Sequence, residues 1–301
     1  MIFVKSEDLK YGMRLAKPIY NKTGVLLYER NTRLTLQGIE SVKNFGLLGL
    51  YILEPAEPVP PMTEEDLDFE RFQTMAVFSI REELDNIIAG REPVNLKRLA
   101  NAIITNYGRL DHKITFTQNL RSTTDYVYKH VINTAILCAL ISAQVYYTPT
   151  EQEELVLAAL LHDIGKLLLP NKVREKYDDY DTNDLIIVKK IQNDGLGLLR
   201  PEIGIDSGVR RIVAQIHRME YGNSNLEQGK ILKSTKILKV ANLFDTMTCM
   251  KISEEAISEI AAIKYLLLNK DEFDEEIVGA LIKSINILTP GVCIELTNRE
   301  K

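Results

Sequence analysis

The residues best suited to chemistry in this chain are the adjacent His162 and Asp163, which interrupt the apolar stretch Leu155–Pro170. Ionisable groups in such a stretch are costly to bury unless an opposite charge compensates them. Neutral imidazole and carboxylate are both good ligands for zinc, iron or manganese, so a bound metal is a suitable compensator. Gly165 and Lys166 follow within one turn. The pattern favours a metal site over the alternative, a buried histidine hydrogen-bonded to the backbone.

Two more histidines and an acid occur in apolar, helix-like sequence where they can complete such a site. His130 precedes His162 by about thirty residues, the separation expected for two helices packed as an antiparallel hairpin. His217 ends a later apolar stretch, and Asp245 lies within the segment VANLFDTM. Three of the four histidines therefore fall in apolar helical segments, which favours ligation over solvation. The alternative, that His130 and His217 are ordinary core histidines, stays open.

Composition and charge indicate a globular protein of the cytoplasm. The 301 residues are 45% apolar and 26% charged with a net charge of −5, so DNA, RNA and anionic membranes are not expected partners. The longest apolar runs, Ala135–Ile141 and Leu155–Leu161, are too short to span a bilayer, and the first residues lack a signal-peptide core. Cys138, Cys249 and Cys293 lie in apolar contexts, as expected for reduced core residues. We expect a cytoplasmic location and no membrane insertion.

By its pattern, the chain divides into a small α+β N-terminal domain and a larger helical domain. Residues 1–53 contain short β-like runs around one helical stretch, Thr35–Asn44. Residues 54–64 are rich in proline, which predicts a stiff linker. Over residues 65–301 apolar residues recur at helical spacing, and Ile285–Leu296 predicts a short C-terminal β-hairpin. The expected fold class is mainly α, a helical bundle with these two additions.

The helix expected to carry His162 and Asp163 has recognisable start and stop signals. Thr150 followed by Glu153 predicts a capping box at its beginning, and Pro170 predicts its end. These signals predict one continuous helix with the His-Asp pair in its apolar interior.

Four segments together make a resemblance to a known family specific. DYVYKHVINTAIL, ALLHDIGKLLLP, VANLFDTM and INILTPGVCIEL resemble, in order, landmarks of the HD-GYP family, and they extend from about Asp125 to Leu296. That family is the branch of the HD phosphohydrolases whose characterised members hydrolyse cyclic di-GMP. The region before the proline-rich segment resembles the small domain that often precedes such modules. The resemblance implies a helical HD-GYP-like domain in a bacterial signalling protein.

The resemblance also implies site residues. In the family, a first histidine, the His-Asp pair and a late aspartate hold one metal, and the pair's aspartate bridges to a second. His130, His162 and Asp163 match the first three of these ligands, and Asp163 would also serve in catalysis. Lys166 matches a lysine that meets a phosphate oxygen, although a lysine here could also extend to the surface. Asp245 matches an aspartate that is not usually a ligand.

The chain departs from the family pattern mainly at the second metal. Ile191 stands where a histidine ligand is expected, and Ile216-His217 replaces a pair of histidines, so His217 is a weak candidate ligand. The late aspartate aligns with Asn242, also a weak candidate. Of the glycine-rich signature that helps to receive the substrate, Gly222 is the one clear match.

These substitutions predict that the two-metal centre is absent. Hydrolysis of a phosphodiester at neutral pH uses two cations to make hydroxide and to neutralise the phosphate. Ile191 and Ile216 cannot ligate and are expected to fill the space beside Asp163 that a second metal would take. We therefore expect at most one divalent metal (iron, manganese or zinc) at His130, His162 and Asp163, or none.

The expected function follows from the weakened site. We expect a signalling protein related to cyclic di-GMP phosphodiesterases, with hydrolysis impaired or lost, that acts as a scaffold or regulatory partner of another protein. One alternative is a residual phosphodiesterase or phosphohydrolase that uses a single metal and a different phosphate ester. The other is a protein that binds a cyclic dinucleotide without cutting it, through Lys166 and Gly222.

Overall fold

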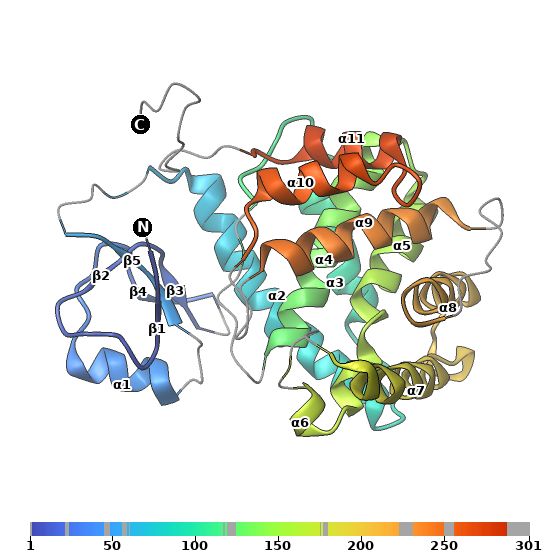
Figure 1. The fold of residues 1–301 in the computed structure, drawn as a ribbon, viewed down its shortest axis with the longest axis horizontal. Helices are drawn as coiled ribbons and strands as arrows, with labels where there is room; N and C mark the ends of the chain where they lie inside the picture. The colour runs from blue at the N-terminus through green and yellow to red at the C-terminus, as the bar shows by residue number, and fades with distance from the viewer. Residues whose placement is uncertain are drawn as a thin grey trace. The chain divides into compact units, whose positions relative to one another are not determined.

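The computed structural model describes residues 2–21, 24–44, 49–55, 59, 61–116, 118, 125–174, 176, 180–222, 231–249 and 256–287. By its internal packing the chain forms two compact units. Unit 1 comprises Met1–Met75, Ile114–Thr123 and Asn286–Lys301, and unit 2 comprises Ala76–Lys113 and Thr124–Ile285. Helices dominate the described residues, which confirms the mainly-α fold class (Figure 1). The domain boundaries placed at residues 53 and 64 stay a prediction.

Unit 1 contains a small antiparallel sheet. Strands β1 (Ile2–Lys5) and β2 (Arg14–Leu15) pair with the two sides of β5 (Gly49–Leu53). A separate hairpin joins β3 (Ile19–Tyr20) to β4 (Leu26–Tyr28), and helix α1 spans Leu36–Asn44. The helix and the strands β1, β4 and β5 lie in the segments that the sequence predicts, whereas β2 and β3 were not predicted individually.

The sheet of unit 1 is stabilised by buried apolar side chains. Strand β5 is buried at nearly every position, and Leu15 and Ile2 both lie opposite Ile52 in the ladder. Burial of one sheet face against α1 gives this short segment its own apolar core. The buried members of that core are Val4, Leu9, Leu15, Leu34, Ile39, Val42, Leu50 and Ile52.

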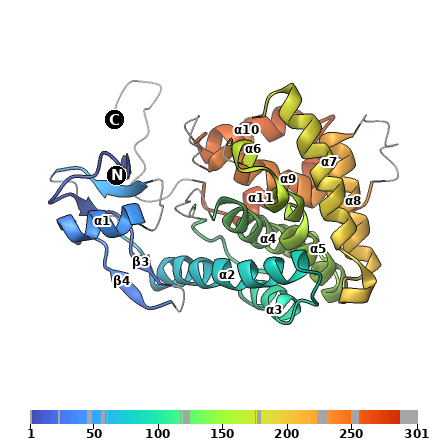
Figure 2. The same ribbon diagram turned by 90° about the horizontal axis from the view of Figure 1, so that it is seen from below.

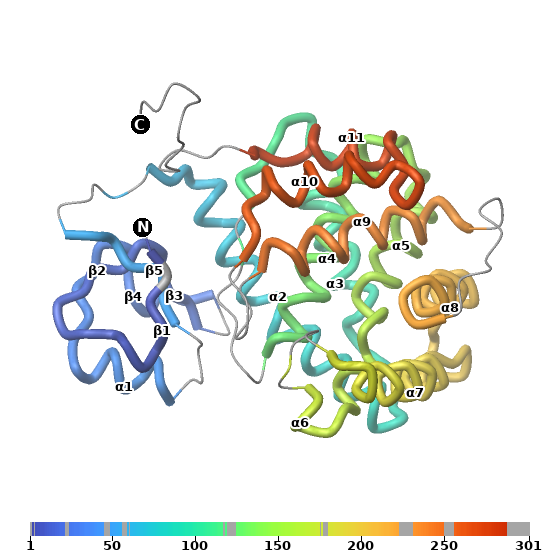
Figure 3. Tube along the Cα trace, viewed as in Figure 1, coloured from blue at the N-terminus to red at the C-terminus, as the bar shows by residue number. Residues whose placement is uncertain are grey.

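Unit 2 is helical throughout its described part, and the tube in Figure 3 follows its path. Helix α2 (Glu64–Ile88) begins in unit 1 and ends in unit 2. The remaining helices of this unit are α3 (Leu96–Tyr107), α4 (Tyr126–Gln144), α5 (Pro149–Leu161), η1 (Ile164–Leu168), α6 (Asn171–Arg174), α7 (Thr182–Leu198), η2 (Pro201–Ile203), α8 (Ser207–Tyr221), α9 (Lys233–Thr248), α10 (Glu259–Leu268) and α11 (Glu275–Ser284).

The centre of unit 2 is the pair of helices α4 and α5. A short connection joins them, so they pack as antiparallel neighbours. Helix α4 is apolar around its whole circumference and almost every residue in it is buried, as a core helix requires. Among the described residues it is also the one helix long and apolar enough to cross a membrane, but 83% of that window is buried inside the protein. Packing in the core accounts for its composition.

Helix α5 begins and ends differently from the prediction. The capping box is formed by Thr148 and Glu151, not by Thr150 and Glu153, because Pro149 fits the first helical position, where no N–H is needed. The helix ends at Leu161 rather than at Pro170, and the chain continues as the tighter η1. The His-Asp pair therefore forms the junction between two helices instead of interrupting one.

The predicted C-terminal hairpin falls on residues 285–296, of which 288–296 lie outside the described residues, as does Cys293. The described start of that segment is tied to unit 1, because the Asn286 N–H donates to the Ile114 carbonyl at 2.8 Å.

Candidate metal centre

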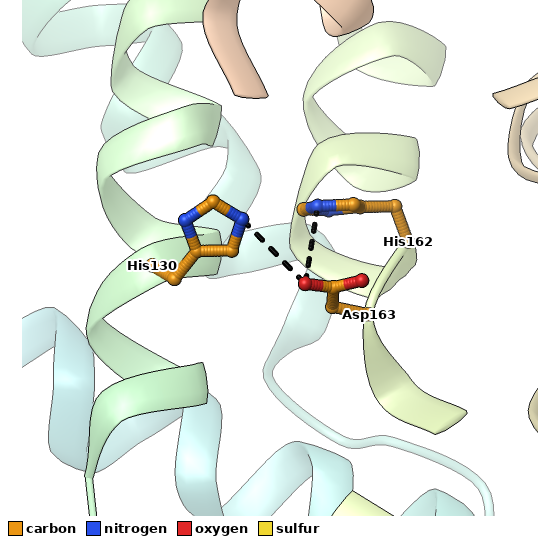
Figure 4. Close-up of side chains that lie close together, drawn as sticks. All are labelled: His130, His162 and Asp163. Carbon is orange, nitrogen blue, oxygen red and sulfur yellow. Dashed lines mark ion pairs between the residues drawn. The ribbon is translucent and has the colours of Figure 1, made fainter. Parts of the chain in front are cut away.

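Three buried side chains converge where the start of α4 meets the end of α5 (Figure 4). His130 lies in the second turn of α4, and His162 and Asp163 follow the last residue of α5. His130 Nε2 is 3.5 Å and His162 Nε2 is 3.6 Å from the same oxygen, Asp163 Oδ2. Antiparallel packing thus brings together residues that are about thirty positions apart in the sequence.

Hydrogen bonds fix which nitrogen of each imidazole carries the proton. His130 Nδ1 lies 2.6 Å from Asp245 Oδ2, and His162 Nδ1 lies 2.7 Å from the Ala159 carbonyl oxygen. A carboxylate and a carbonyl only accept, so each Nδ1 donates, and in the neutral form of each ring Nε2 is the atom with the free lone pair. Asn133 Nδ2 donates to Asp245 Oδ1 at 2.9 Å and holds that carboxylate in place. A carboxylate behind a histidine in this way is typical of metal sites.

The three converging atoms fit a divalent cation. Both Nε2 atoms are buried and have no hydrogen-bond partner among the described residues. Without a cation, two lone pairs would face a carboxylate oxygen at 3.5 and 3.6 Å between buried side chains, which is repulsive. Two ligands bound tetrahedrally at about 2.1 Å from a metal lie about 3.4 Å apart. The spacing and the chemistry of His130, His162 and Asp163 therefore match a metal site.

The charges around Asp163 favour its ionised form. Lys166 is buried, and its Nζ lies 2.8 Å from Asp163 Oδ2 as an ion pair, so this lysine does not extend to the surface. Burial alone would raise the pKa of Asp163, but the Lys166 ammonium holds it well below the usual range. Burial lowers the pKa of His162 to about 4, which keeps this imidazole neutral and able to ligate at neutral pH.

The other oxygen of Asp163 has a different neighbour, Gln192 of α7. Gln192 is buried, and its Nε2 donates to Asp163 Oδ1 at 2.8 Å. Ile191 packs instead against the apolar group of Leu169, Val173 and Val188. The expectation that Ile191 fills the space beside Asp163 is therefore wrong by one residue, because the helix turns Gln192 toward the site.

Two glycines explain how α7 approaches so closely. A Cβ on Gly195 would lie 2.5 Å from Gly165 Cα, and a Cβ on Gly165 would lie 2.7 Å from Gln192 Cα. The backbones of α7 and η1 are therefore in direct contact at this crossing, which side chains at either glycine would prevent. Gly165 of the HDIGK segment thus serves packing.

Histidine 217 lies beside the site without joining the three-residue cluster. Its Nε2 donates to the His162 carbonyl at 2.6 Å, and its Nδ1 has no hydrogen-bond partner in the described part of the chain. Burial lowers its pKa. Ile216 is fully buried in α8, and Gly222 ends that helix. The ligand role of His217 and the substrate role of Gly222 stay predictions, and residues 223–230 lie outside the described residues.

Asn242 lies on α9 one turn before Asp245. Its Nδ2 donates to Glu220 Oε1 at 2.5 Å, whereas its Oδ1 is buried and has no hydrogen-bond partner among the described residues. Helix α8, which carries Glu220, packs against both α7 and α9 (Figures 1 and 2). Neither Gln192 nor Glu220 was expected from the sequence. The one available signal for Gln192 was a polar residue at helical spacing between Val188 and Gly195.

A comparison with protein families identifies this arrangement. The family model described as HD domain matches residues 95–277, which contain all the side chains of the cluster. The chain belongs to the HD-domain family. The match covers more than half of the chain and runs from the start of α3 into α11.

The chain is similar to bacterial proteins that are named as cyclic di-GMP phosphodiesterases. The chain is 22% identical over 180 residues to the cyclic di-GMP phosphodiesterase PA4108 of Pseudomonas aeruginosa, covering 59% of the chain and 44% of the relative. It is 26% identical over 152 residues to the cyclic di-GMP phosphodiesterase response regulator RpfG of Xanthomonas campestris, covering 49% and 40%. It is 23% identical over 184 residues to the cyclic di-GMP phosphodiesterase PdeB of Borreliella burgdorferi, covering 58% and 47%. These matches confirm the predicted relationship to cyclic di-GMP phosphodiesterases, although the chain spans less than half the length of each relative.

Proposed function

We propose that the protein is an HD-GYP-like signalling protein that holds one divalent metal at His130, His162 and Asp163 and has lost two-metal hydrolysis of cyclic di-GMP. The observation that carries this proposal is the difference between the two oxygens of Asp163. Oδ2 faces two unprotonated imidazole nitrogens, whereas Oδ1 accepts a hydrogen bond from Gln192. In the proposed state the protein acts as a scaffold or regulatory partner in the cytoplasm.

The loss of the second cation follows from the neighbours of Oδ1. A bridging carboxylate must offer one oxygen to each metal. Here Oδ2 pairs with Lys166 and also faces the two imidazole Nε2 atoms, whereas Oδ1 accepts an amide N–H from Gln192 and faces neither imidazole. Among the described residues, the side chains of Ile191 and Ile216 have no metal-binding atom, whereas those of Gln192 and His217 do. Two neutral groups and a carboxylate oxygen that already accepts a hydrogen bond form a weak site for a second cation.

The one metal, when bound, would supply a Lewis acid and would lower the pKa of a bound water. The chain's own residues set the orientation and the charge of the groups around that centre. Asp245 and the Ala159 carbonyl keep the Nε2 atoms of His130 and His162 unprotonated. Lys166 keeps Asp163 ionised and provides a buried positive charge next to an anionic ligand.

A second candidate function is a one-metal phosphohydrolase. It is favoured by the complete His130, His162 and Asp163 cluster together with the buried Lys166 ammonium, which suits a phosphate ester. A cyclic dinucleotide is the natural ligand to test, because the relatives are named for that substrate. Binding without cleavage would make the protein a cyclic dinucleotide sensor.

Metal content and turnover of the purified full chain test the proposal. We expect one equivalent of manganese, iron or zinc per chain by mass spectrometry, lost in His130→Ala and in His162→Ala. The matched control is His112→Ala, because His112 is exposed and lies outside the cluster. Cyclic di-GMP hydrolysis should be at least about 100-fold slower than in a two-metal relative, as expected when transition-state charge stabilisation is removed.

The possible outcomes separate the candidates. Two equivalents of metal with rapid hydrolysis would contradict the proposal, and so would the failure of any divalent metal to bind. One equivalent with turnover of a phosphate ester that His162→Ala abolishes would instead establish the one-metal phosphohydrolase.

A further inference from the structure

The contact between Glu220 and Asn242 suggests how the single site obtains its fourth ligand. We infer that Glu220 is a positioning residue that turns the amide oxygen of Asn242 toward the metal held by His130, His162 and Asp163. This inference rests on the proposed one-metal function. It assigns Glu220, which lies on a different helix from every member of the cluster, a role in metal affinity.

The chemistry of the contact fixes the orientation of the amide. Glu220 Oε1 lies 2.5 Å from Asn242 Nδ2, and an ionised carboxylate can only accept hydrogen bonds. The NH₂ group must therefore face Glu220, which leaves Oδ1 on the other branch of the amide, directed away from Glu220 Oε1. That oxygen is buried and has no hydrogen-bond partner in the described part of the chain, although such atoms are costly to leave unpaired. A cation would satisfy it.

The helices that carry the two residues already contact the cluster. Asn242 and Asp245 are three residues apart on α9 and share one face, and Asp245 holds the His130 imidazole. Glu220 and His217 have the same spacing on α8, and His217 is hydrogen-bonded to the His162 carbonyl. Asn242 thus lies one turn from the carboxylate that holds His130, and Glu220 lies one turn from the histidine that is bonded to the His162 carbonyl.

Glu220 also supplies charge. An amide oxygen is a weaker ligand than a carboxylate, but a charge-assisted hydrogen bond on its NH₂ group polarises the amide and makes the oxygen more negative. The pair of Glu220 and Asn242 therefore carries the negative charge that a single aspartate would carry, with the carboxylate one interaction further from the metal. This charge is placed on α8 instead of α9.

Calorimetric titration of the metal-free full chain with Mn²⁺ tests the inference. Glu220→Ala should lower the affinity by about 10–100-fold, the usual effect of losing a residue that orients a ligand. Glu220→Gln should lower it less, because the glutamine oxygen still accepts from Asn242 but carries no charge. The matched control is Glu202→Ala, an exposed glutamate of η2 that should leave the affinity unchanged.

A charge exchange separates positioning from a general structural effect. Asn242→Asp alone places two carboxylates in contact, so its affinity gain should be small. In Glu220→Gln/Asn242→Asp the glutamine NH₂ can donate to the new carboxylate, and the affinity should exceed that of the wild type. Additive effects of the two changes, or an unchanged affinity in Glu220→Ala with metal still bound at His130, would overturn this inference alone. A wild-type chain that binds no Mn²⁺ would overturn the proposed function as well.

Discussion

The two carboxylate oxygens of Asp163 have different neighbours, although they belong to the same side chain. Oδ2 faces the Nε2 atoms of His130 and His162, which carry no proton and have no hydrogen-bond partner among the described residues. Oδ1 accepts a hydrogen bond from Gln192. On the first side, two imidazole nitrogens converge on Oδ2, and the N–H groups that reach this oxygen come from the Lys166 ammonium at 2.8 Å. On the second side, an amide proton already lies between the groups.

Under the proposed function, this difference explains how a chain could lose one of two cations and keep the other. A proton shared in a hydrogen bond stabilises a buried carboxylate oxygen without a cation. The second side can therefore stay folded in the absence of metal, because one Gln192 side chain satisfies Oδ1. On the first side the Lys166 ammonium stabilises Oδ2, but neither Nε2 atom has a hydrogen-bond partner among the described residues, so this side also favours a bound cation.

The largest expected effect comes from removing Asp163 itself. In Asp163→Ala the Lys166 ammonium is left buried without its partner, which should destabilise the metal-free protein by about 3–5 kcal/mol. Urea denaturation measures this loss. The double variant Asp163→Ala/Lys166→Met should recover much of it, and a double variant as unstable as the single one would contradict the ion-pair explanation.

Added metal should stabilise the protein through the Oδ2 side of Asp163, where His130 and His162 lie. Mn²⁺ at 100 times its dissociation constant should raise the free energy of unfolding by about 2.7 kcal/mol, and a chelator should reverse the change. His130→Ala should abolish the stabilisation, whereas His217→Ala should retain most of it because His217 lies outside the cluster. Equal losses in both variants would show that the two sides act as one site.

A smaller effect is expected behind the His130 ring. Asp245→Asn keeps the size of the side chain but weakens the charge that fixes the His130 tautomer. The affinity for Mn²⁺, measured by calorimetry, should fall about 10–100-fold. An unchanged affinity would mean that the imidazole needs no carboxylate behind it to ligate.

The smallest effect on metal affinity is expected on the Oδ1 side of Asp163, where Gln192 lies. Gln192→Ala leaves Asp163 Oδ1 without its donor and should cost about 1–3 kcal/mol in the free energy of unfolding, measured by urea denaturation. The Mn²⁺ affinity should change by less than about tenfold, below the usual effect of removing an orienting residue. A larger loss of affinity, or a gain of a second equivalent of metal, would contradict the separation of the two sides.

The first side could be predicted from the sequence because its ligands follow helical rules. His130 and His162 lie on two apolar helices joined by a short connection, so their approach follows from antiparallel packing. The capping box was misplaced by two residues because two Thr-x-x-Glu patterns overlap there, and Pro149 selects the earlier one. Helix content and the strands of unit 1 followed directly from periodicity.

The second side could not be predicted because it depends on how α7 is rotated against η1. That rotation is set by the contact between Gly165 and Gly195, which are thirty residues apart and leave no local pattern. Comparison of sequence motifs predicted Ile191 as the neighbour of Asp163. In the structure the neighbour is Gln192, which is hydrogen-bonded to Asp163 Oδ1. For the same reason Glu220 was overlooked, since its partner Asn242 lies on another helix.

The crossing of α7 over η1 has a practical consequence for engineering. Main chain rests on main chain at Gly165 and Gly195, and the Gln192 side chain lies against Gly165 at the same crossing. Exchanging Gln192 for glutamate, which is nearly the same size, would therefore vary the chemistry next to Asp163 with little change in the backbone spacing. One position of the chain can thus be used to test how the group opposite Asp163 Oδ1 affects metal binding.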